Sequence, residues 1–470
     1  MGGDVASGRV RRVATVAAAL ACGLALPVPA AAQGSNCFGE TDANQVEQRP
    51  GPNLRFGITP GVQTGQLGTG AQPTRTPEDP ARQLDALARL RPANAPFVLR
   101  LHRFFWSDGE EAVRRFAELT ERYTAAGYLV EFQLRYHPTE EQEGDIAAWS
   151  EFVRQIVRRF GPNPRVVGLQ VTNEVNLTFS PDSSDGAYEG ARDALIQGVI
   201  AAQAEKRRLG YDQLEIGFNW AYRTDPENER RFWQYLRDNG GPPFVAALDW
   251  VGVDAYPGTF FPPAVTSPGE ERDAMVNAFS TFRCLAAIPG IPESVPIHIE
   301  ENGYPTGPNR SEERQVQAMD AMIAAAHDFR GTYNITDYRW FNLRDGDSTS
   351  PNPQVRYGLM TDEYGEKLGF PRYRDLVAEL TARTSGERPR LRLRVRCSRT
   401  RKPRASLTGH DERQVWSVEF LAGRRVLGQD SDRPFTKTLG SGRLGRGVAR
   451  ARVEMADGRR ARLKRPFRRC

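Results

Sequence analysis

Two glutamates, each at the end of a short apolar run, have the residue type and the setting for paired-carboxylate chemistry. Glu301 follows Val295-Pro-Ile-His-Ile-Glu300 and precedes Asn-Gly-Tyr-Pro305, while Glu174 closes the run Val166-Val-Gly-Leu-Gln-Val-Thr-Asn-Glu174. An apolar run that ends in an acid and a turn indicates a buried strand that delivers a carboxylate to its C-terminal end. Two carboxyl groups suffice to break a glycosidic bond, because one protonates the leaving oxygen and the other attacks the anomeric carbon or activates water.

The segments around these two motifs alternate between strand-like and helix-like patterns. Short apolar runs predict strands over residues 54–58, 97–102, 128–134, 166–172, 214–219, 250–255, 297–301 and 338–343. The clearest helical pattern runs from Asp145 to Phe160 and is closed by Gly161, and Ser311 is the expected N-cap of another helix. Eight such units over about 330 residues predict an α/β fold, a (β/α)8 TIM barrel, whose strands all end at one mouth.

The two acids would therefore meet at that mouth, from the fourth and seventh strands. A doubly wound sheet is the alternative arrangement, but no glycine-rich phosphate loop follows the first predicted strand.

The charge and the hydrophobic pattern of the sequence change near residue 385. From Glu387 onward about 25 Lys and Arg stand against about 8 acids, so the net charge of +6 conceals a net acidic remainder. Apolar residues alternate with polar ones there, and Asp457-Gly458 is a hairpin signal, which together predict a small immunoglobulin-like β-sandwich. The expected organisation is a signal peptide (1–32), a linker (33–52), a catalytic barrel (53–384) and a basic β-sandwich (385–470).

The N-terminus has the three parts of a secretory signal peptide. Arg9, Arg11 and Arg12 precede an apolar run over residues 13–26, and Ala30-Ala-Ala32 is a cleavage site of the A-x-A type. The apolar run is too short to span a bilayer. We therefore expect a secreted, extracellular protein.

Export leaves four cysteines, which permit three disulfide connectivities. Cys397 and Cys470 bracket the basic tail, so we pair them, and Cys37 with Cys284 then remains. No Cys/His spacing indicates a zinc site, and no cofactor is expected.

The two motifs resemble those of glycoside hydrolase clan A, the retaining (β/α)8 β-glycosidases. Asn173-Glu174 is similar to the Asn-Glu pair that ends the fourth strand of that clan, and Glu301-Asn-Gly303 to its nucleophile segment on the seventh. The resemblance covers residues 54 to about 380. It implies that Glu174 is the general acid/base, that Glu301 is the nucleophile, and that Asn173 binds the 2-hydroxyl of the sugar.

The resemblance also implies three supporting residues. Arg100 would orient the nucleophile and keep it ionised, because a nearby cation favours the charged form of a carboxyl group. Tyr256 would contact the nucleophile, and Trp340 would form the floor under the sugar. His137 and Asn219 end predicted strands and are candidates for substrate binding, with packing as the alternative.

Glu300 adjoins Glu301, and adjacent strand residues point to opposite faces, so only one of them is expected in the site. The Glu-Asn-Gly spacing selects Glu301, and we expect Glu300 to meet a basic residue on a helix.

Three other classes of function fit the sequence less well. A metal-dependent barrel hydrolase would need an H-x-H pair, which none of the five histidines forms. A noncatalytic carbohydrate-binding barrel is the main alternative, although it would not need both acids. The basic tail could bind an anionic cell-wall polymer, while nucleic acid is not expected, because no RNA-stacking motif accompanies its arginines. The expected partner is a polysaccharide or oligosaccharide substrate.

Overall fold

A computed structural model describes residues 37–49, 51–61, 74–92, 95–381, 389–397, 402–409, 411–412, 415–430, 434–439, 446–455 and 460–468. The expected signal peptide, the Asp457-Gly458 turn and Cys470 lie outside these residues. The predicted disulfide between Cys397 and Cys470 therefore stays a prediction.

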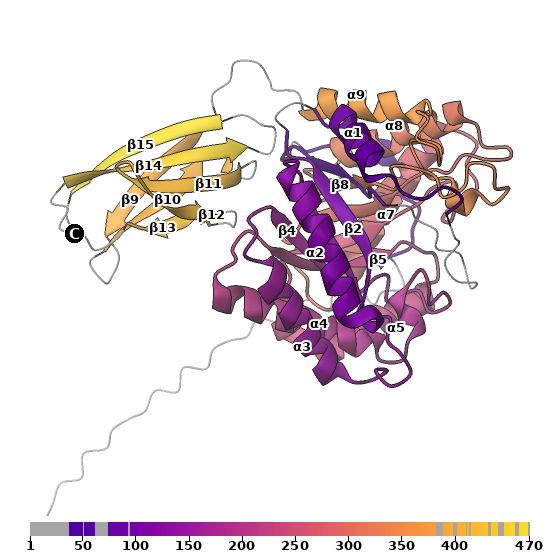
Figure 1. Ribbon diagram of the computed structural model, residues 1–470, viewed down its shortest axis with the longest axis horizontal. Helices are drawn as coiled ribbons and strands as arrows, with labels where there is room; N and C mark the ends of the chain where they lie inside the picture. Colours follow the sequence, from indigo (N-terminus) through magenta and orange to yellow (C-terminus); the bar gives the residue numbers. More distant parts are fainter. Residues whose placement is uncertain are drawn as a thin grey trace, which may run out of the picture.

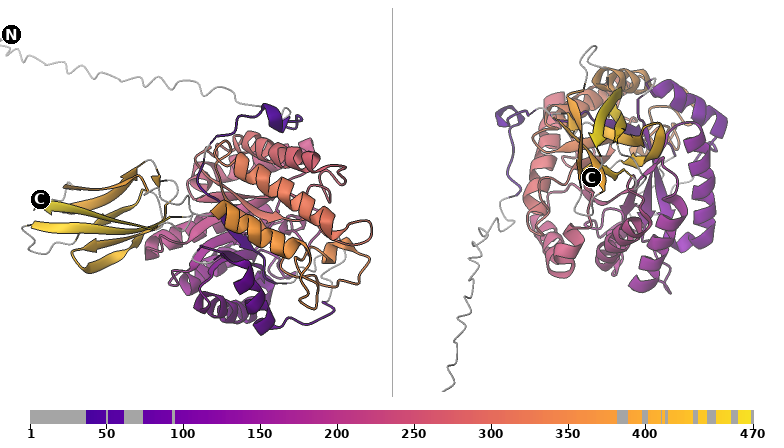
Figure 2. Two further views of the ribbon diagram at one scale, coloured as in Figure 1. Left: turned by 90° about the horizontal axis from the view of Figure 1, so that it is seen from above. Right: turned by 90° about the vertical axis from the view of Figure 1, so that its left-hand side faces the viewer.

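Eight parallel strands close into a barrel in chain order, with β1 paired to β8, which confirms the predicted fold class (Figure 1). The strands are β1 (Arg55–Ile58), β2 (Val98–Phe105), β3 (Leu129–Arg135), β4 (Val166–Val171), β5 (Glu215–Ala221), β6 (Trp250–Asp254), β7 (Ile297–Asn302) and β8 (Ile335–Trp340). Helices surround them as an outer layer (Figure 2). The helices are α1 (Pro80–Leu90), α2 (Gly109–Ala125), α3 (Ile146–Phe160), α4 (Ala191–Leu209), α5 (Pro226–Tyr235), α6 (Gly241–Val245), α7 (Pro268–Ala286), α8 (Glu312–Asp328) and α9 (Gly369–Thr381).

The helix ends follow the local chemistry of the sequence. Asp145 is the N-cap of α3 and accepts a hydrogen bond from the backbone N–H of Ala148, and Gly161 follows the last helical residue. Ser311 caps α8 in the same way through the N–H of Arg314. Both predicted helix starts are confirmed.

The eighth strand begins three residues before its predicted start and ends at Trp340. The polar residues Thr336 and Asp337 lie in its first half and interrupt the apolar run, so the strand was predicted to start too late. Along this strand Asp337 and Arg339 contact charged groups of other barrel strands, whereas Tyr338 and Trp340 pack in the apolar layer between the barrel and the helices.

Charged side chains fill much of the barrel interior below the mouth. Arg55 pairs with Asp337 and, at 2.7 Å, with Glu215, while Arg339 lies 2.8 Å from Asp337 and 3.0 Å from Glu131. Barrels of this type are usually filled by Val, Ile and Leu. We call this group the ionic core, and it consists of Arg55, Glu131, His298, Glu300, Asp337 and Arg339.

Part of the stretch predicted as a linker is packed against the barrel. Cys37 is buried and forms a disulfide with Cys284 of α7, which confirms the predicted pair. The backbone N–H of Thr41 donates to Asn277 on the same helix, and Ala43 belongs to the barrel's apolar core. Residues 37–49 are therefore part of the folded unit, and the linker prediction is wrong for them.

The C-terminal strands form two antiparallel sheets that share one apolar core. The sheet orders are β13-β10-β9 and β12-β11-β14-β15. The strands are β9 (Leu391–Cys397), β10 (Pro403–Gly409), β11 (Val415–Ala422), β12 (Arg425–Asp430), β13 (Thr436–Thr438), β14 (Arg446–Met455) and β15 (Arg460–Arg468). Inward residues of both sheets, such as Leu393 and Phe420, form the core, as expected for a two-layered sandwich.

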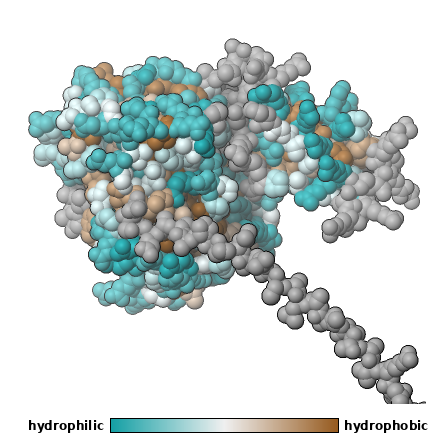
Figure 3. All heavy atoms as spheres, turned by 180° about the vertical axis from the view of Figure 1, so that it is seen from behind, coloured by the Kyte–Doolittle hydropathy of each residue, from teal (hydrophilic) through white to brown (hydrophobic). Residues whose placement is uncertain are grey.

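Among the described residues, no helix is both long enough and apolar enough to cross a membrane. Hydrophilic residues dominate the face drawn in Figure 3, and the hydrophobic residues on it are scattered.

Candidate active site

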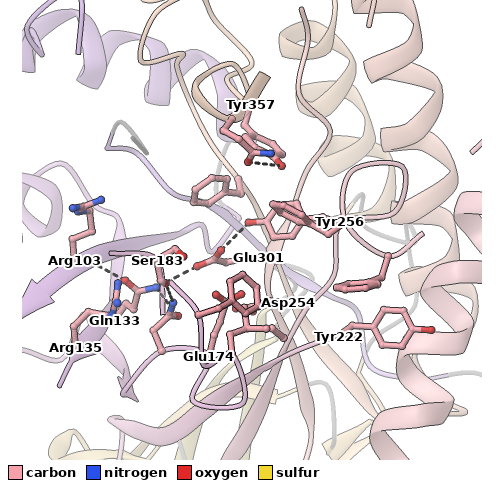
Figure 4. Close-up of a pocket in the computed structure, with 18 residues that line it drawn as sticks. Arg103, Gln133, Arg135, Glu174, Ser183, Tyr222, Asp254, Tyr256, Glu301 and Tyr357 are labelled. Atoms are coloured by element: carbon pink, nitrogen blue, oxygen red, sulfur yellow. Dashed lines mark hydrogen bonds between the residues drawn. The ribbon is translucent and has the colours of Figure 1, made fainter. Parts of the chain in front are cut away.

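The barrel mouth holds a cavity, open to solvent, that brings Glu174 and Glu301 together (Figure 4). One carboxylate oxygen from each of Glu174, Asp254 and Glu301 lies within 4.8 Å of the other two. The expected convergence of the two glutamates is therefore confirmed. Aromatic side chains supply much of the remaining wall, namely Phe179, Tyr222, Tyr256, Phe260, Phe261, Phe341 and Tyr357.

Glu174 lies just after β4, where the backbone takes an uncommon conformation. Thr172 and Glu174 both have positive φ angles, 64° and 47°, which non-glycine residues adopt at a cost. Two buried side chains hold this turn: Asn219 accepts from the N–H of Glu174 at 2.9 Å, and Asp185 accepts from the N–H of Asn173 at 2.9 Å. The turn aims the Glu174 carboxyl group into the cavity.

Glu301 ends β7 and receives hydrogen bonds on both of its oxygens. Arg100 Nη1 donates to Oε1 at 2.8 Å, the Tyr256 hydroxyl donates to Oε2 at 2.7 Å, and Gln133 Nε2 lies 3.2 Å from Oε1. A carboxylate held by a guanidinium and two neutral donors is fixed in orientation. Arg100 and Tyr256 therefore both contact Glu301, as the resemblance to clan A implies.

The two acids sit in different electrostatic settings. Burial, reinforced by the charge of Glu301 and opposed by Arg135 and Arg100, raises the pKa of Glu174 to about 8. Burial of Arg100 would by itself lower its pKa, but the adjacent Glu301 and Glu300 carboxylates raise it, so this guanidinium stays charged. A neutral carboxyl group beside an ion-paired carboxylate is the division of roles that acid-assisted substitution requires.

Asn173 and Asn219 belong to an amide network beneath the acids. Asn173 Oδ1 accepts from Gln133, Gln170 and Asn219, at 2.8, 3.0 and 2.7 Å. Asn219 also donates to Asp254, whose pKa is raised well above its ordinary value by burial and then by the charges of Glu301 and Glu174. Asn173 lines the cavity, whereas Asn219 is buried and acts on the site through the Glu174 backbone.

The expected position of Glu300 is wrong. Its side chain does not meet a helix but lies buried inside the barrel, with Oε2 3.2 Å from Arg100 Nε and Oε1 3.3 Å from His298 Nδ1. The pairing of β7 with β8 shifts register between Ile299 and Asn302, so strict alternation does not hold there. Glu300 and Glu301 consequently both contact Arg100.

Trp340 is not the floor of the cavity, and that prediction is wrong. Its side chain is fully buried under α9, with its ring 6.1 Å from that of Tyr373, because it shares the outward face of β8 with Tyr338. Phe341, the next residue, lines the cavity in its place.

His137 lies beside the cavity rather than in its wall. Its ring packs 4.4 Å from that of Phe105, and its Nδ1 is 3.2 Å from Ser107 Oγ.

Gln133 and Arg135 line the cavity and were missed by the sequence analysis. They alternate with apolar residues in Glu131-Phe-Gln-Leu-Arg135 on β3. Polar residues at every second position of a buried strand are the signal that would have placed them inside the barrel.

Neither a family model nor a curated protein matches this sequence. Several solved structures resemble the fold. A β-glucosidase from Thermotoga maritima in complex with castanospermine is 12% identical, with a TM-score of 0.48 over 71% of this chain and 99% of that one. A glycoside hydrolase family 17 β-1,3-glucanosyltransferase from Rhizomucor miehei is 15% identical, with a TM-score of 0.44 over 67% and 96%. A Bacteroides uniformis β-glucuronidase is 13% identical, with a TM-score of 0.44 over 89% of this chain, which spans only 46% of that enzyme.

Proposed function

We propose that this protein is a secreted retaining glycoside hydrolase of clan A type that cleaves β-linked glycans by double displacement. The observation that carries the proposal is the approach of Glu174 and Glu301 oxygens to within 4.8 Å at the barrel mouth. Carboxyl groups about 5 Å apart suit a covalent intermediate, whereas inverting enzymes keep them about 6.5–9.5 Å apart to admit a water.

In the first step the Glu174 carboxyl group gives its proton to the glycosidic oxygen while a Glu301 oxygen attacks the anomeric carbon. The bond from that carbon to the leaving oxygen breaks, and a glycosyl ester of Glu301 forms. In the second step the Glu174 carboxylate takes a proton from water, whose oxygen displaces Glu301. Both acids return to their starting states, so no cofactor takes part.

The surrounding residues have positioning roles in this proposal. Arg100 and Tyr256 orient Glu301 for attack, and both keep its charge available. Asn173 lies in the cavity wall, where its amide can bind the 2-hydroxyl of the sugar. Phe341 takes the place first given to Trp340, as an apolar surface for the C–H face of a pyranose.

The stereochemistry of the product tests the proposal. We expect the purified protein to release the β-anomer first from a β-linked glycan, because two inversions at one carbon restore the configuration. Proton NMR of the anomeric signal during the first minutes of reaction, over a panel of β-glucans, β-xylans and β-galactans, makes the measurement. Initial release of the α-anomer would exclude the mechanism, and binding of glycans without turnover would favour a noncatalytic carbohydrate-binding barrel.

The pH dependence follows from the pKa of Glu174. A general acid must be protonated in the free enzyme, so kcat/KM is expected to hold below pH 8 and to fall as the pH rises through about 8. A 2,4-dinitrophenyl glycoside, whose leaving group needs no proton in the first step, serves as the control. Its kcat/KM should lack this basic limb, and an identical limb for both substrates would contradict the role of Glu174.

A second function, binding of an anionic polymer, is favoured by the pairing of like charges on the C-terminal sheet. Arg450 stands opposite Lys464 on β14 and β15, and Arg452, which is also paired with Glu419 at 2.7 Å, stands opposite Arg462. Like charges directly opposite each other destabilise a sheet, so a polyanion that neutralises them would be bound. We expect the full chain to bind a polyuronate in a salt-sensitive manner, and replacement of Arg450 and Arg462 by Gln to weaken it. Binding unchanged by salt or by these replacements would contradict this function.

A further inference from the structure

Arg103 places in the wall of the cavity a cation that forms no ion pair with any described residue. Its guanidinium makes no hydrogen bond or ion pair within the described part of the chain, and its Nη1 atom is buried without a partner. Asp182 and, more weakly, Asp108 act on it only from a distance, and Asp108 is paired with Arg115 at 3.0 Å. A buried, unpaired donor of this kind is costly for a protein to keep.

The backbone aims this side chain. The pairing of β2 with β3 shifts register between Leu101 and Phe104, and Arg103 has a φ of 65°. Bulges of this kind occur beside active sites, where they redirect a side chain. The backbone N–H of Arg103 donates to Gln133 at 2.9 Å, and Gln133 in turn contacts Glu301. The position of the cation is thus tied to that of the proposed nucleophile.

The guanidinium is also held by an aromatic ring. Arg103 and Arg135 both pack on Phe105, with the guanidinium carbons 5.1 and 5.4 Å from the ring centre. Figure 4 shows both arginines on one side of Glu301, with Tyr256 and Tyr222 on the other. A guanidinium fixed in this way keeps its planar fork of donors ready for a carboxylate or sulfate group.

The other ionisable side chains that line the cavity either form an ion pair or have a raised pKa. Arg135 is paired with Asp185 at 2.8 Å, and Glu301 with Arg100 at 2.8 Å. Burial raises the pKa of Glu174 to about 8 and that of Asp254 well above its ordinary value, which favours the uncharged form of each carboxyl group.

Arg103 itself stays charged. Burial and the neighbouring Arg135 lower its pKa to about 10, which leaves the guanidinium protonated at neutral pH. Among the described residues that line the cavity, Arg103 is therefore the cation with no carboxylate in ion-pair contact.

We infer that the cavity binds a glycan that carries an anionic group, a carboxylate or a sulfate ester, and that Arg103 binds its oxygens. The inference rests on the proposed function for the glycan nature of the ligand and adds its charge. Arg103 is a specificity-determining residue in this account, because neutral sugars of the same shape would leave its guanidinium unpaired.

The binding of charged and neutral glycans to a catalytically inactive variant tests this inference independently of hydrolysis. The probes are β-linked disaccharides that are identical except at C6 of the non-reducing sugar, which carries a hydroxymethyl, a carboxylate or a sulfate ester, in gluco and galacto series. They are titrated calorimetrically into the full chain bearing Glu301→Gln, with and without Arg103→Met. Arg114→Met, on the exposed face of α2, removes the same charge outside the cavity and is the matched control.

We expect at least one anionic probe to bind at least about 10-fold more tightly than its neutral partner, and Arg103→Met to weaken that probe by about 10- to 100-fold. Binding of the neutral probe should change by less than about threefold in Arg103→Met, and Arg114→Met should alter neither. Comparison of the carboxylate probes with the sulfate probes shows which of the two anions Arg103 binds. Equal weakening of charged and neutral probes, or no anionic probe that depends on Arg103, would overturn the inference.

The two proposals fail in different ways. A wild-type protein that hydrolyses neutral glycans without preference for charged ones would leave the proposed function standing and remove this inference. Binding of an anionic disaccharide that depends on Arg103, in a wild-type protein that cleaves no glycan, would support the anion site and contradict the glycosidase.

Discussion

Replacing Glu301 by Gln is expected to lower kcat on an aryl β-glycoside by about 10⁴-fold or more, because an amide cannot form the glycosyl ester. The glutamine oxygen can still accept from Arg100, so the fold and the binding of substrate should persist. Initial rates under saturating substrate, with thermal unfolding to verify folding, make the measurement.

Glu300→Gln is the matched comparison for this variant. The two acids are adjacent and share Arg100, but only Glu301 lines the cavity. We expect Glu300→Gln to lower kcat by less than about 10²-fold while it lowers the thermal midpoint, since its carboxylate belongs to a buried ionic group. A larger kcat loss in Glu300→Gln than in Glu301→Gln would reverse the assignment.

Glu174→Ala is expected to lose activity according to the leaving group. For a glycan, whose leaving alcohol needs a proton, kcat/KM should fall by about 10²–10⁴-fold, and for a 2,4-dinitrophenyl glycoside much less. In the second case the glycosyl ester accumulates, because no base activates water. Added azide should then accelerate turnover and give a β-glycosyl azide, detectable by NMR.

Asp254→Asn provides the control for azide rescue. Asp254 lies in the same cavity and within 4.8 Å of both glutamates, but it has no role as the proton donor in this mechanism. We expect azide to leave the rate of Asp254→Asn unchanged. Rescue of this variant, or failure to rescue Glu174→Ala, would assign the acid/base role elsewhere.

The barrel and its two acids could be predicted because strand ends carry a strong local signal. Apolar runs that stop at Asn173-Glu174 and at Glu301 located both residues, and parallel strands necessarily end at one mouth. The C-terminal sheets could be predicted for a similar reason, since alternation of side chains is visible over a few residues. The disulfide between Cys37 and Cys284 could be predicted because these two cysteines remained once Cys397 was paired with Cys470.

The wrong predictions and the missed residues lie where the pairing of neighbouring strands, rather than the local sequence pattern, decides where a side chain points. Glu300 and Arg103 both lie next to shifts of register, which depend on the neighbouring strand and leave no mark in the segment itself. Trp340 was misplaced because β8 begins with polar residues, which hid its alternation. Residues 37–49 read as a linker because their attachment to α7 is made by a disulfide and a few distant contacts.

The ionic core beneath the mouth constrains how this protein can diverge. Removing a single partner of a buried charge pair costs about 3–5 kcal/mol, a large part of the 5–15 kcal/mol that typically stabilises a domain. Arg339 is paired with both Glu131 and Asp337, and Asp337 is also paired with Arg55, so the loss of Arg339 or Asp337 would leave more than one charge without a partner. Homologues should therefore either keep all the charged residues of the ionic core or replace all of them with apolar residues. Substitutions at these positions should depend strongly on one another, and few proteins that carry only one of them should fold stably.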